Sequence, residues 1–392
     1  MREGWTYKKF GEVGSFLRGK SIQKADFVEQ GMPCIHYGQI HTKFGVSVNK
    51  HLSEIPLELY KKSIIASPGD VIIAITSEDL EGSCKSTAWL GDYDVAVSAH
   101  AAVYKHNLNP KFIAYYLRSN SFYTEKEKYA RGFKVMEIKP TDIAQIPLPI
   151  PSVEVQKSIV AELDKINELI SLKKAQLSDL DSLAQSIFYD MFGDPIVNEK
   201  GWEVKKMMDL CANIVDCPHS TPKKSDFVTD YPCIRTSELK GGSISWDTMQ
   251  YLEKEEYEIR IARLKPEAGD IVFGREGTIG DAVILPQGYN FSLGQRTMLL
   301  RANTEIISNV FLHRVILSEW MKQQIEYVNV SSTVAHVNIK DFKQFTVPLP
   351  PLSLQQEFAN RIELIEQQKA QISSTIKDLE TLLASRMQYW FD

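Results

Sequence analysis

A short acid-x-Lys pattern in the second half of the chain could hold a catalytic metal ion. Glu238 and Lys240 follow two upstream acids, Asp226 and Asp230, and carboxylates of this kind bind the metal ions of many nucleases. The aligned part of the first half, residues 40–42, reads Ile-His-Thr, so the two halves do not share the pattern. Since such short matches are frequent in unrelated sequences, we do not assign nuclease activity.

A glycine-rich turn and a diproline raise two further enzymatic possibilities. Residues 274–281, "GREGTIGD", could form a phosphate-binding loop, but they match neither GxGxxG nor GxxxxGK[ST]. A DNA methyltransferase would also need a Pro-Pro-Tyr or Pro-Pro-Phe motif, and the diproline at 350–351 is followed by Leu352. No Ser-His-Asp or Cys-His arrangement can be argued either. We expect a chain without catalytic residues or a nucleotide of its own.

The cysteines indicate a reducing compartment and no metal. Five cysteines, at 34, 84, 211, 217 and 233, are an odd number without CxxC spacing. No Cys/His cluster has the spacing of zinc ligands, and Cys34 and Cys233 are expected to be small core residues. There is no apolar run of about 20 residues and no hydrophobic segment near the N-terminal "MREGWTYKKF". These features predict a cytoplasmic protein.

The acidic charge is concentrated in two segments. With 43% hydrophobic residues and a mean hydropathy of −0.22, the 392-residue chain has the composition of a globular protein of two or three domains. The net charge of −5 and the pI near 6.0 argue against a simple electrostatic binder of nucleic acid. However, residues 151–200 and 349–392 together contribute −6. The rest of the chain is therefore close to neutral.

The chain contains an internal duplication with a period near 199 residues. Similar blocks recur in the same order with offsets between 197 and 200, which chance does not explain. The matched blocks are Gly4-Trp5 with Gly201-Trp202, "PCI" at 33–35 with 232–234, "PGD" at 68–70 with "AGD" at 268–270, Pro151 and Gln156 with Pro350 and Gln355, and "SLAQSIFYDMFGD" with "TLLASRMQYWFD".

Each half ends in about 40 residues with the 4-3 apolar spacing of a coiled-coil seam. The predicted seam residues are Leu163, Ile166, Ile170, Leu177 and Leu180 in the first half, and Ile362, Ile365, Ile372, Ile376 and Leu379 in the second. Lys173 interrupts the first seam, and Lys369 and Arg386 interrupt the second; polar residues at such positions can fix the pairing register. Helices of about 60 Å are too long to pack only on their own domain, so we predict that they pair with each other.

The predicted fold is α+β: two repeated mixed α/β domains joined by two long helices in an antiparallel coiled coil with pseudo-twofold symmetry. We predict a first head at residues 1–148, a central helix at 149–193, a second head at 194–347 and a C-terminal helix at 348–392. Double-stranded DNA also has dyad axes, and twofold proteins bind it as two separated half-sites. The helices would then be a spacer that sets the distance between half-sites.

Over essentially its whole length, the sequence resembles a known family, the specificity subunits (HsdS) of type I restriction–modification systems. The proline-led helix entries "IPLPIPSVEVQKSIVAELDKI" and "VPLPPLSLQQEFANRI" resemble the family pattern "IPLPPLxEQxxIV". Further similar segments are "GDVIIAITSED" (69–79), "ARGFKVMEIKPTDIAQIPLP" (130–149), "DCPHSTPK" (216–223), "GDIVFGREGTIG" (269–280) and "SLGQRTMLLR" (292–301). The first head has no counterpart of "REGTIG", which indicates that the two heads bind different half-sites.

The resemblance implies that each head is a target recognition domain for one half of a bipartite, gapped DNA sequence. It also implies partners: two methylation subunits (HsdM) with S-adenosylmethionine, docked on the helices and the domain flanks, and restriction subunits (HsdR), with ATP and Mg²⁺ on partner subunits. The specificity chain itself would perform no chemistry.

Polar and basic residues at loops and strand ends are the candidates for DNA contact, because such side chains hold phosphates and base edges. The resemblance implies that the loop before the exit strand of each head, residues 129–135 and 330–340, faces DNA. The candidates in the first head are Lys20, Lys24, His36, Tyr37, Gln39, Arg131 and Lys134. Those in the second head are Lys223, Lys224, Arg235, Thr236, Ser237, Arg275, Thr278, Gln295, Arg296, Ser331, Ser332, Thr333, His336 and Asn338.

Each candidate has a structural alternative. The basic residues could be solvated surface charges, and the residues after "PCI" could only close the strand ends by hydrogen bonding. At the level of the whole chain, the alternative is a symmetric scaffold whose nearly neutral heads bind protein partners instead of DNA.

Overall fold

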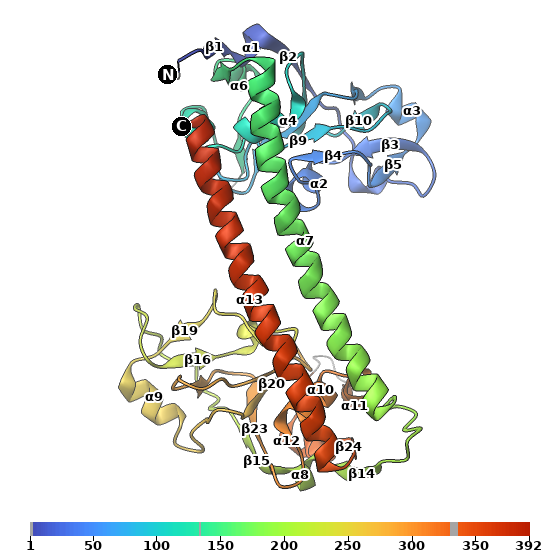
Figure 1. Cartoon of the computed structure of the whole chain (residues 1–392), viewed down its shortest axis with the longest axis vertical. Helices are drawn as coiled ribbons and strands as arrows, with labels where there is room; N and C mark the ends of the chain where they lie inside the picture. Colours follow the sequence, from blue (N-terminus) through green and yellow to red (C-terminus); the bar gives the residue numbers. More distant parts are fainter. Residues whose placement is uncertain (1–2, 133–134, 330–335) are drawn as a thin grey trace. The chain divides into compact units, whose positions relative to one another are not determined.

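The chain forms two compact units, each containing one head and half of each long helix. The structure is a computed structural model and describes residues 3–132, 135–329 and 336–392. The first unit comprises Met1–Lys174 and Ser374–Asp392, and the second comprises Ala175–Ser373. The compact units therefore do not coincide with consecutive stretches of sequence (Figure 1).

The first head contains β1–β13 and α1–α6. Its strands are β1 (Thr6–Lys9), β2 (Gly14–Arg18), β3 (Met32–Ile35), β4 (Ser47–Val48), β5 (Ser53–Ile55), β6 (Ile64–Ala66), β7 (Val71–Ala74), β8 (Thr76–Ser77), β9 (Ser86–Trp89), β10 (Val95–Val97), β11 (Ala101–His106), β12 (Met136–Glu137) and β13 (Pro147–Ile150). Its helices are α1 (Phe10–Val13), η1 (Lys24–Asp26), α2 (Tyr37–Thr42), α3 (Leu57–Tyr60), α4 (Pro110–Tyr116), α5 (Asn120–Glu127) and α6 (Pro140–Ile143).

The second head contains β14–β24 and α8–α12. Its strands are β14 (Glu203–Lys206), β15 (Cys211–Asp216), β16 (Pro232–Ile234), β17 (Leu239–Lys240), β18 (Ser243–Ile244), β19 (Gln250–Tyr251), β20 (Ile271–Gly274), β21 (Ala282–Ile284), β22 (Ser292–Leu293), β23 (Thr297–Ala302) and β24 (Thr346–Leu349). Its helices are α8 (Met207–Leu210), η2 (Thr236–Glu238), α9 (Lys254–Arg260), α10 (Asn309–Ile316), α11 (Glu319–Asn329) and α12 (Ile339–Phe342).

The two heads have the same sheet topology, which confirms the duplication. One sheet of the first head has the order β2-β11-β7-β9-β4, and the corresponding sheet of the second has β15-β23-β20-β21. A second sheet contains β5-β3-β10-β6 in the first head and β19-β16-β22 in the second. In both heads the first strand pairs antiparallel with the last, β1 with β13 and β14 with β24. The heads differ at the sheet edges, where β4 and β6 have no equivalent among the described strands.

A buried glutamine fixes the start of each long helix to its head. The helices are α7 (Val153–Phe192) and α13 (Leu352–Phe391). The Oε1 atom of Gln156 accepts a hydrogen bond from the backbone N–H of Asn109 (3.1 Å), and that of Gln355 accepts one from Ser308 (2.8 Å). Each amide also donates to the carbonyl of the proline five residues earlier. The repeated Pro-x₄-Gln pattern thus gives the same junction in both units.

The aromatic end of each long helix packs against the head formed by the other half of the chain. In the first unit, the ring of Phe391 lies 5.6 Å from that of Phe112 on α4, between ring centroids. In the second unit, the ring of Phe192 lies 4.7 Å from that of Phe311 on α10. All four rings are buried. These pairs are equivalent positions of the duplication, so each head's core is completed by a helix from the other repeat.

The helices pair antiparallel within each unit, as predicted. In the first unit Arg386 of α13 binds Glu162 of α7, and further along α7 Lys174 lies 2.9 Å from Glu380. In the second unit, shown in Figure 1 with α7 beside the first part of α13, Lys369 lies 2.8 Å from Asp181. Toward the C-terminus of α7, the paired residues of α13 therefore have decreasing residue numbers, as expected for antiparallel helices.

The predicted seam lies between the paired helices, and its charged interruptions have partners. Eight of the ten predicted seam residues are buried, whereas Leu177 and Leu379 are half-buried. Burial alone would lower the pKa of Lys369, but hydrogen bonds to Asp181 and Glu366 outweigh it and raise that pKa. Because a buried charge without its partner is costly, these ion pairs favour one register of the seam.

Replacing the buried phenylalanine at one helix end by alanine should destabilise only the unit that contains it. Phe391→Ala removes a buried ring and should lower the free energy of unfolding of the first unit by about 3 kcal/mol. In hydrogen exchange of the intact chain, the amides of α4 should exchange faster and those of α10 should not change. Phe192→Ala should have the opposite pattern.

The control is Leu382→Ala, a change at an exposed side chain of the same helix as Phe391, which should alter stability by less than about 0.5 kcal/mol. Equal acceleration of exchange in α4 and α10 by Phe391→Ala would contradict the assignment of this ring to the first head.

Candidate nucleic-acid interface

Four segments that are distant in the sequence meet in the first head through backbone hydrogen bonds. The N–H of Ser98, after β10, donates to the carbonyl of Ile35 at the end of β3 (3.1 Å). The N–H of Ile75, after β7, donates to the carbonyl of His100 (2.9 Å), and the N–H of Ile138 donates to the carbonyl of Ile75 (3.0 Å). We call this arrangement the four-segment frame.

The second head repeats the frame bond for bond. Gly294 donates to Ile234 (2.7 Å), Arg275 donates to Arg296 (2.8 Å), and Val337 donates to Arg275 (3.0 Å), all through backbone atoms. The frame brings together the segment after "PCI", the glycine-rich block, the "GQR" turn and the segment before the exit strand. These are the segments that the sequence analysis singled out for DNA contact.

Two side chains of the first head that were predicted to contact DNA make hydrogen bonds inside the head. His36 is buried, and its Nδ1 accepts a hydrogen bond from the N–H of Gly38 (3.2 Å). Gln39 accepts from the N–H of His36 (3.0 Å) and donates to Ser53 (2.7 Å). Burial, followed by the charge of Lys24, lowers the pKa of His36. The pair caps α2, which is the hydrogen-bonding role that the structural alternative predicts.

The equivalent position of the second head has the same reciprocal cap with different chemistry. Arg235 donates through its backbone N–H (2.9 Å) and its Nη2 (2.7 Å) to Glu238, which is fully buried. The hydroxyl of Ser237 donates to the same carboxylate (2.7 Å). The hydroxyl of Thr278 donates to the carbonyl of Thr236 (3.2 Å). These bonds close the strand end and fix the glycine-rich turn against it.

Arg275, which was predicted to lie near DNA, is buried inside the second head. Only 9% of the residue is exposed; its Nε donates to the carbonyl of Val337 (3.1 Å) and its guanidinium is paired with Asp216. Similarly, Asn338 caps α12, and Gln295 donates to the carbonyl of His219 (2.7 Å). These three side chains support the frame from within.

The remaining predicted residues lie at the surface. Tyr37 is half-buried, and the exposed ones are Lys20, Lys24, Arg131, Lys223, Lys224, Arg296 and His336. Lys20 pairs through its backbone with Ser98 of the frame, whereas Lys224 pairs with Leu252 next to β19. Lys134, Ser331, Ser332 and Thr333 lie outside the described residues.

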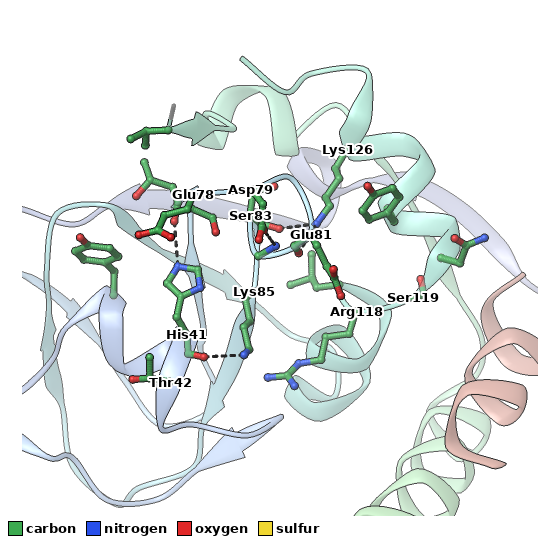
Figure 2. Close-up of a pocket in the computed structure, with 18 residues that line it drawn as sticks. His41, Thr42, Glu78, Asp79, Glu81, Ser83, Lys85, Arg118, Ser119 and Lys126 are labelled. Carbon is green, nitrogen blue, oxygen red and sulfur yellow. Dashed lines mark hydrogen bonds between the residues drawn. The ribbon is translucent and has the colours of Figure 1, made fainter. Parts of the chain in front are cut away.

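The first head has a large open pocket beside its frame, lined by both acidic and basic residues (Figure 2). Its volume is about 1160 Å³, and its lining includes Tyr37 and the loop of residues 76–85. Glu78, Asp79 and Glu81 of this loop are exposed. Carboxylates at such a site can accept hydrogen bonds from the amino groups of cytosine or adenine.

The basic residues of this pocket are bound to backbone carbonyls. Lys126, which is 3% exposed, donates from Nζ to the carbonyls of Ser83 (2.6 Å) and Glu81 (3.1 Å). Lys85 donates to the carbonyl of His41 (2.8 Å). Burial lowers the pKa of Lys126, partly offset by nearby Cys84 and acidic residues. Lys126 therefore binds the main chain of the acidic loop at two carbonyls (Figure 2).

The second head has a smaller polar pocket at the equivalent frame. Its volume is about 190 Å³, and it is lined by Arg296, Glu276 and His219 among others. The Nε of Arg296 lies 3.2 Å from a carboxylate oxygen of Glu276, and His219 lies 3.3 Å from Asp216. This head therefore presents an arginine paired with a carboxylate, and a histidine beside another carboxylate, where the first presents an acidic loop.

Sequence reasoning missed His100, Glu276 and the acids of residues 78–81. His100 occupies the position of Arg296, as the matching hydrogen bonds to Ile75 and Arg275 establish. Their offset is 196 instead of 199, so the two residues do not coincide at the period of the other blocks. Aligning the buried strands "VAV" (95–97) and "SL" (292–293), which precede them, would have found the pair.

Two structural features bear on other classes of function. Among the described residues, no group of three or more His, Cys, Asp or Glu side chains could hold a metal ion. Within the same part of the chain, no helix is long and apolar enough to cross a membrane.

Comparison with known proteins gives one consistent family. A family model described as a type I restriction modification DNA specificity domain matches residues 2–181 and 199–381. The EcoKI specificity subunit of Escherichia coli K12 is 23% identical over 387 residues, covering 93% of this chain and 82% of that protein. The MjaVIII specificity subunit of Methanocaldococcus jannaschii is 21% identical, covering 97% and 92%.

Solved structures give the same fold. The S subunit of a type I restriction–modification system from M. genitalium has a TM-score of 0.57 at 13% identity and covers 99% of this chain and 96% of its own. A chain solved in work on the assembly and conformational transition of a type I R-M system has a TM-score of 0.58 at 17% identity, with coverages of 100% and 98%.

Removing the buried lysine should loosen the acidic loop. Lys126→Met leaves the carbonyls of Glu81 and Ser83 without their donor, at a cost of about 1 to 3 kcal/mol. Hydrogen exchange of residues 78–84 should become faster.

The matched control is Lys128→Met, since Lys128 lies near the same helix end with an exposed side chain paired to Glu125. It should change neither stability nor exchange by a measurable amount. Unchanged exchange of the loop in Lys126→Met would show that the lysine does not position it.

Proposed function

The chain belongs to the type I restriction modification DNA specificity family, and on that premise we propose that each head reads one half of a bipartite, gapped DNA target. The observation that supports this most directly is the four-segment frame. Its backbone bonds are the same in both heads, whereas its side chains differ, for example Ile75 against Arg275 and His100 against Arg296. One framework with two sets of polar groups suits two different half-sites.

We propose that the exposed basic residues around the frames contact phosphates. Lys20, Lys24 and Arg131 would do so in the first head, and Lys223 and Lys224 in the second. Phosphate contacts orient a protein on the duplex without specifying sequence. Because the heads are close to neutral, much of the charge needed for affinity would come from partner subunits.

We propose that those partners are two methylation subunits, docked on the paired helices and the head flanks, with restriction subunits joining for cleavage. S-adenosylmethionine, ATP and Mg²⁺ would be bound by these partners. This chain would determine which DNA sequence is bound and would supply no reacting group. The length of the paired helices would set the gap between half-sites.

Exchanging the first recognition head should change one half of the methylated sequence. Because Phe391 completes its core, the exchange should replace residues 1–150 together with helix segments 153–174 and 374–392 by those of a relative. Single-molecule sequencing of the host genome would then identify the methylated bases.

The matched control makes the same exchange with a relative that methylates the same first half-site, and it should leave the target unchanged. If the head exchange leaves both half-sites unaltered while the complex assembles and methylates, the heads do not determine the sequence and a protein-binding scaffold is the better description.

Lengthening both helices should widen the gap between half-sites. Seven residues inserted after Lys174 and seven after Ser373 preserve the heptad phase and add about 10 Å, or roughly three base pairs. Insertion into one helix alone should disrupt the pairing and abolish methylation. A gap that stays the same after the double insertion is incompatible with the spacer role.

A further inference from the structure

The turn at the centre of each frame has a backbone conformation that is unfavourable for its residue. His100 has φ of +67° and Arg296 has φ of +66°, in the left-handed region that glycine adopts freely and other residues adopt at a cost of about 1 kcal/mol or more. The conformation follows from the fold, because the chain leaves a parallel pairing in one sheet (β10 with β3, β22 with β16) and immediately enters an antiparallel pairing in another.

The other two non-glycine residues of the described chain with positive φ have structural explanations. Asn198 exchanges two hydrogen bonds between its side-chain amide and the backbone of Trp202 (2.9 and 3.0 Å). Cys84 is fully buried in the core of the first head. Among the described residues, neither the His100 nor the Arg296 side chain makes a hydrogen bond to backbone, and both are exposed. Folding alone does not explain a large polar residue at these two positions.

Local contacts orient both side chains. The imidazole of His100 lies 5.2 Å from the ring of Tyr37, between centroids. The Nε of Arg296 lies 3.2 Å from Glu276, and 63% of the arginine side chain is exposed. Nε forms an ion pair with the carboxylate, and no described residue hydrogen-bonds to the two terminal nitrogens of the guanidinium. These nitrogens form the fork that recognises O6 and N7 of guanine.

Neighbouring polar residues of the frame are already engaged inside the heads, namely His36 and Gln39 in one and Arg235 and Arg275 in the other. His100 and Arg296, in contrast, occupy equivalent positions in the two heads, and both side chains are exposed to solvent.

We infer that His100 and Arg296 are equivalent base-reading residues, one for each half-site, and that Arg296 reads a guanine. Glu276 is the positioning residue for Arg296. The inference rests on the proposed function, since it assumes that the frames face DNA.

Glycine substitutions separate recognition from folding. In His100→Gly and Arg296→Gly the side chain is removed and the backbone strain is relieved, so the thermal stability of the chain should stay the same or rise. In the complete complex with its methylation subunits, each variant should lose the base requirement at one position of one half-site. For Arg296→Gly that position should be a guanine, and the dissociation constant for the original target should rise about 10- to 100-fold.

Asn198→Gly is the matched control. It relieves the same backbone conformation outside the frames and removes hydrogen bonds to Trp202, so it should lower stability and leave the target sequence unchanged.

An unchanged target in either glycine variant would overturn the inference for that residue. Weakening by the same factor on every DNA sequence would also overturn it, because this is the behaviour of a phosphate contact. A relaxed position other than guanine would overturn the assignment of Arg296. The head exchange tests the proposed function independently, since it can succeed while both glycine variants leave the target unaltered.

Discussion

The packing of each helix end into the head of the other repeat is the contact on which the rest of the structure depends. Phe391 against Phe112 and Phe192 against Phe311 make the same buried contact in the two units. A head therefore acquires its complete core only when both helices are in place. The antiparallel pairing and the ion pair between Lys369 and Asp181 follow from the same arrangement. Each long helix begins at the head of its own repeat and ends at the head of the other, so the two helices have opposite directions.

Within each head, buried groups support the frame, and other side chains of the same frame are exposed and can take part in recognition. The frame consists of main-chain hydrogen bonds and of buried side chains such as Arg275, Glu238 and Lys126, each with defined partners. Its exposed positions, such as His100 and Arg296, tolerate different chemistry because no core contact depends on them. This division explains how two heads with the same topology can present an acidic loop in one case and an arginine paired with a carboxylate in the other.

The helical and repeated parts of the protein could be predicted well, and the site only in part. Seam positions such as Ile166 and Ile372 are buried as the 4-3 spacing indicated. Polar residues were harder to assign: His36 and Arg235 follow buried strands, as base-reading residues would, but they bond to capping groups three residues or fewer away, and Arg235 also donates to the carbonyl of Thr248. Arg275 pairs with Asp216, 59 residues earlier, and no spacing rule identifies such a partner.

By itself, the sequence determined the duplication, the two long helices and their pairing, because periodicity and repeated blocks are properties of the chain that do not depend on distant contacts. The tertiary structure decided which polar side chains are exposed. A hydrogen-bonding group becomes buried or free according to what the fold places beside it, and here the neighbours come from four distant segments. His100 is an example. Only the matched backbone hydrogen bonds, from Ile75 to His100 and from Arg275 to Arg296, show that these two residues occupy equivalent positions in the two heads.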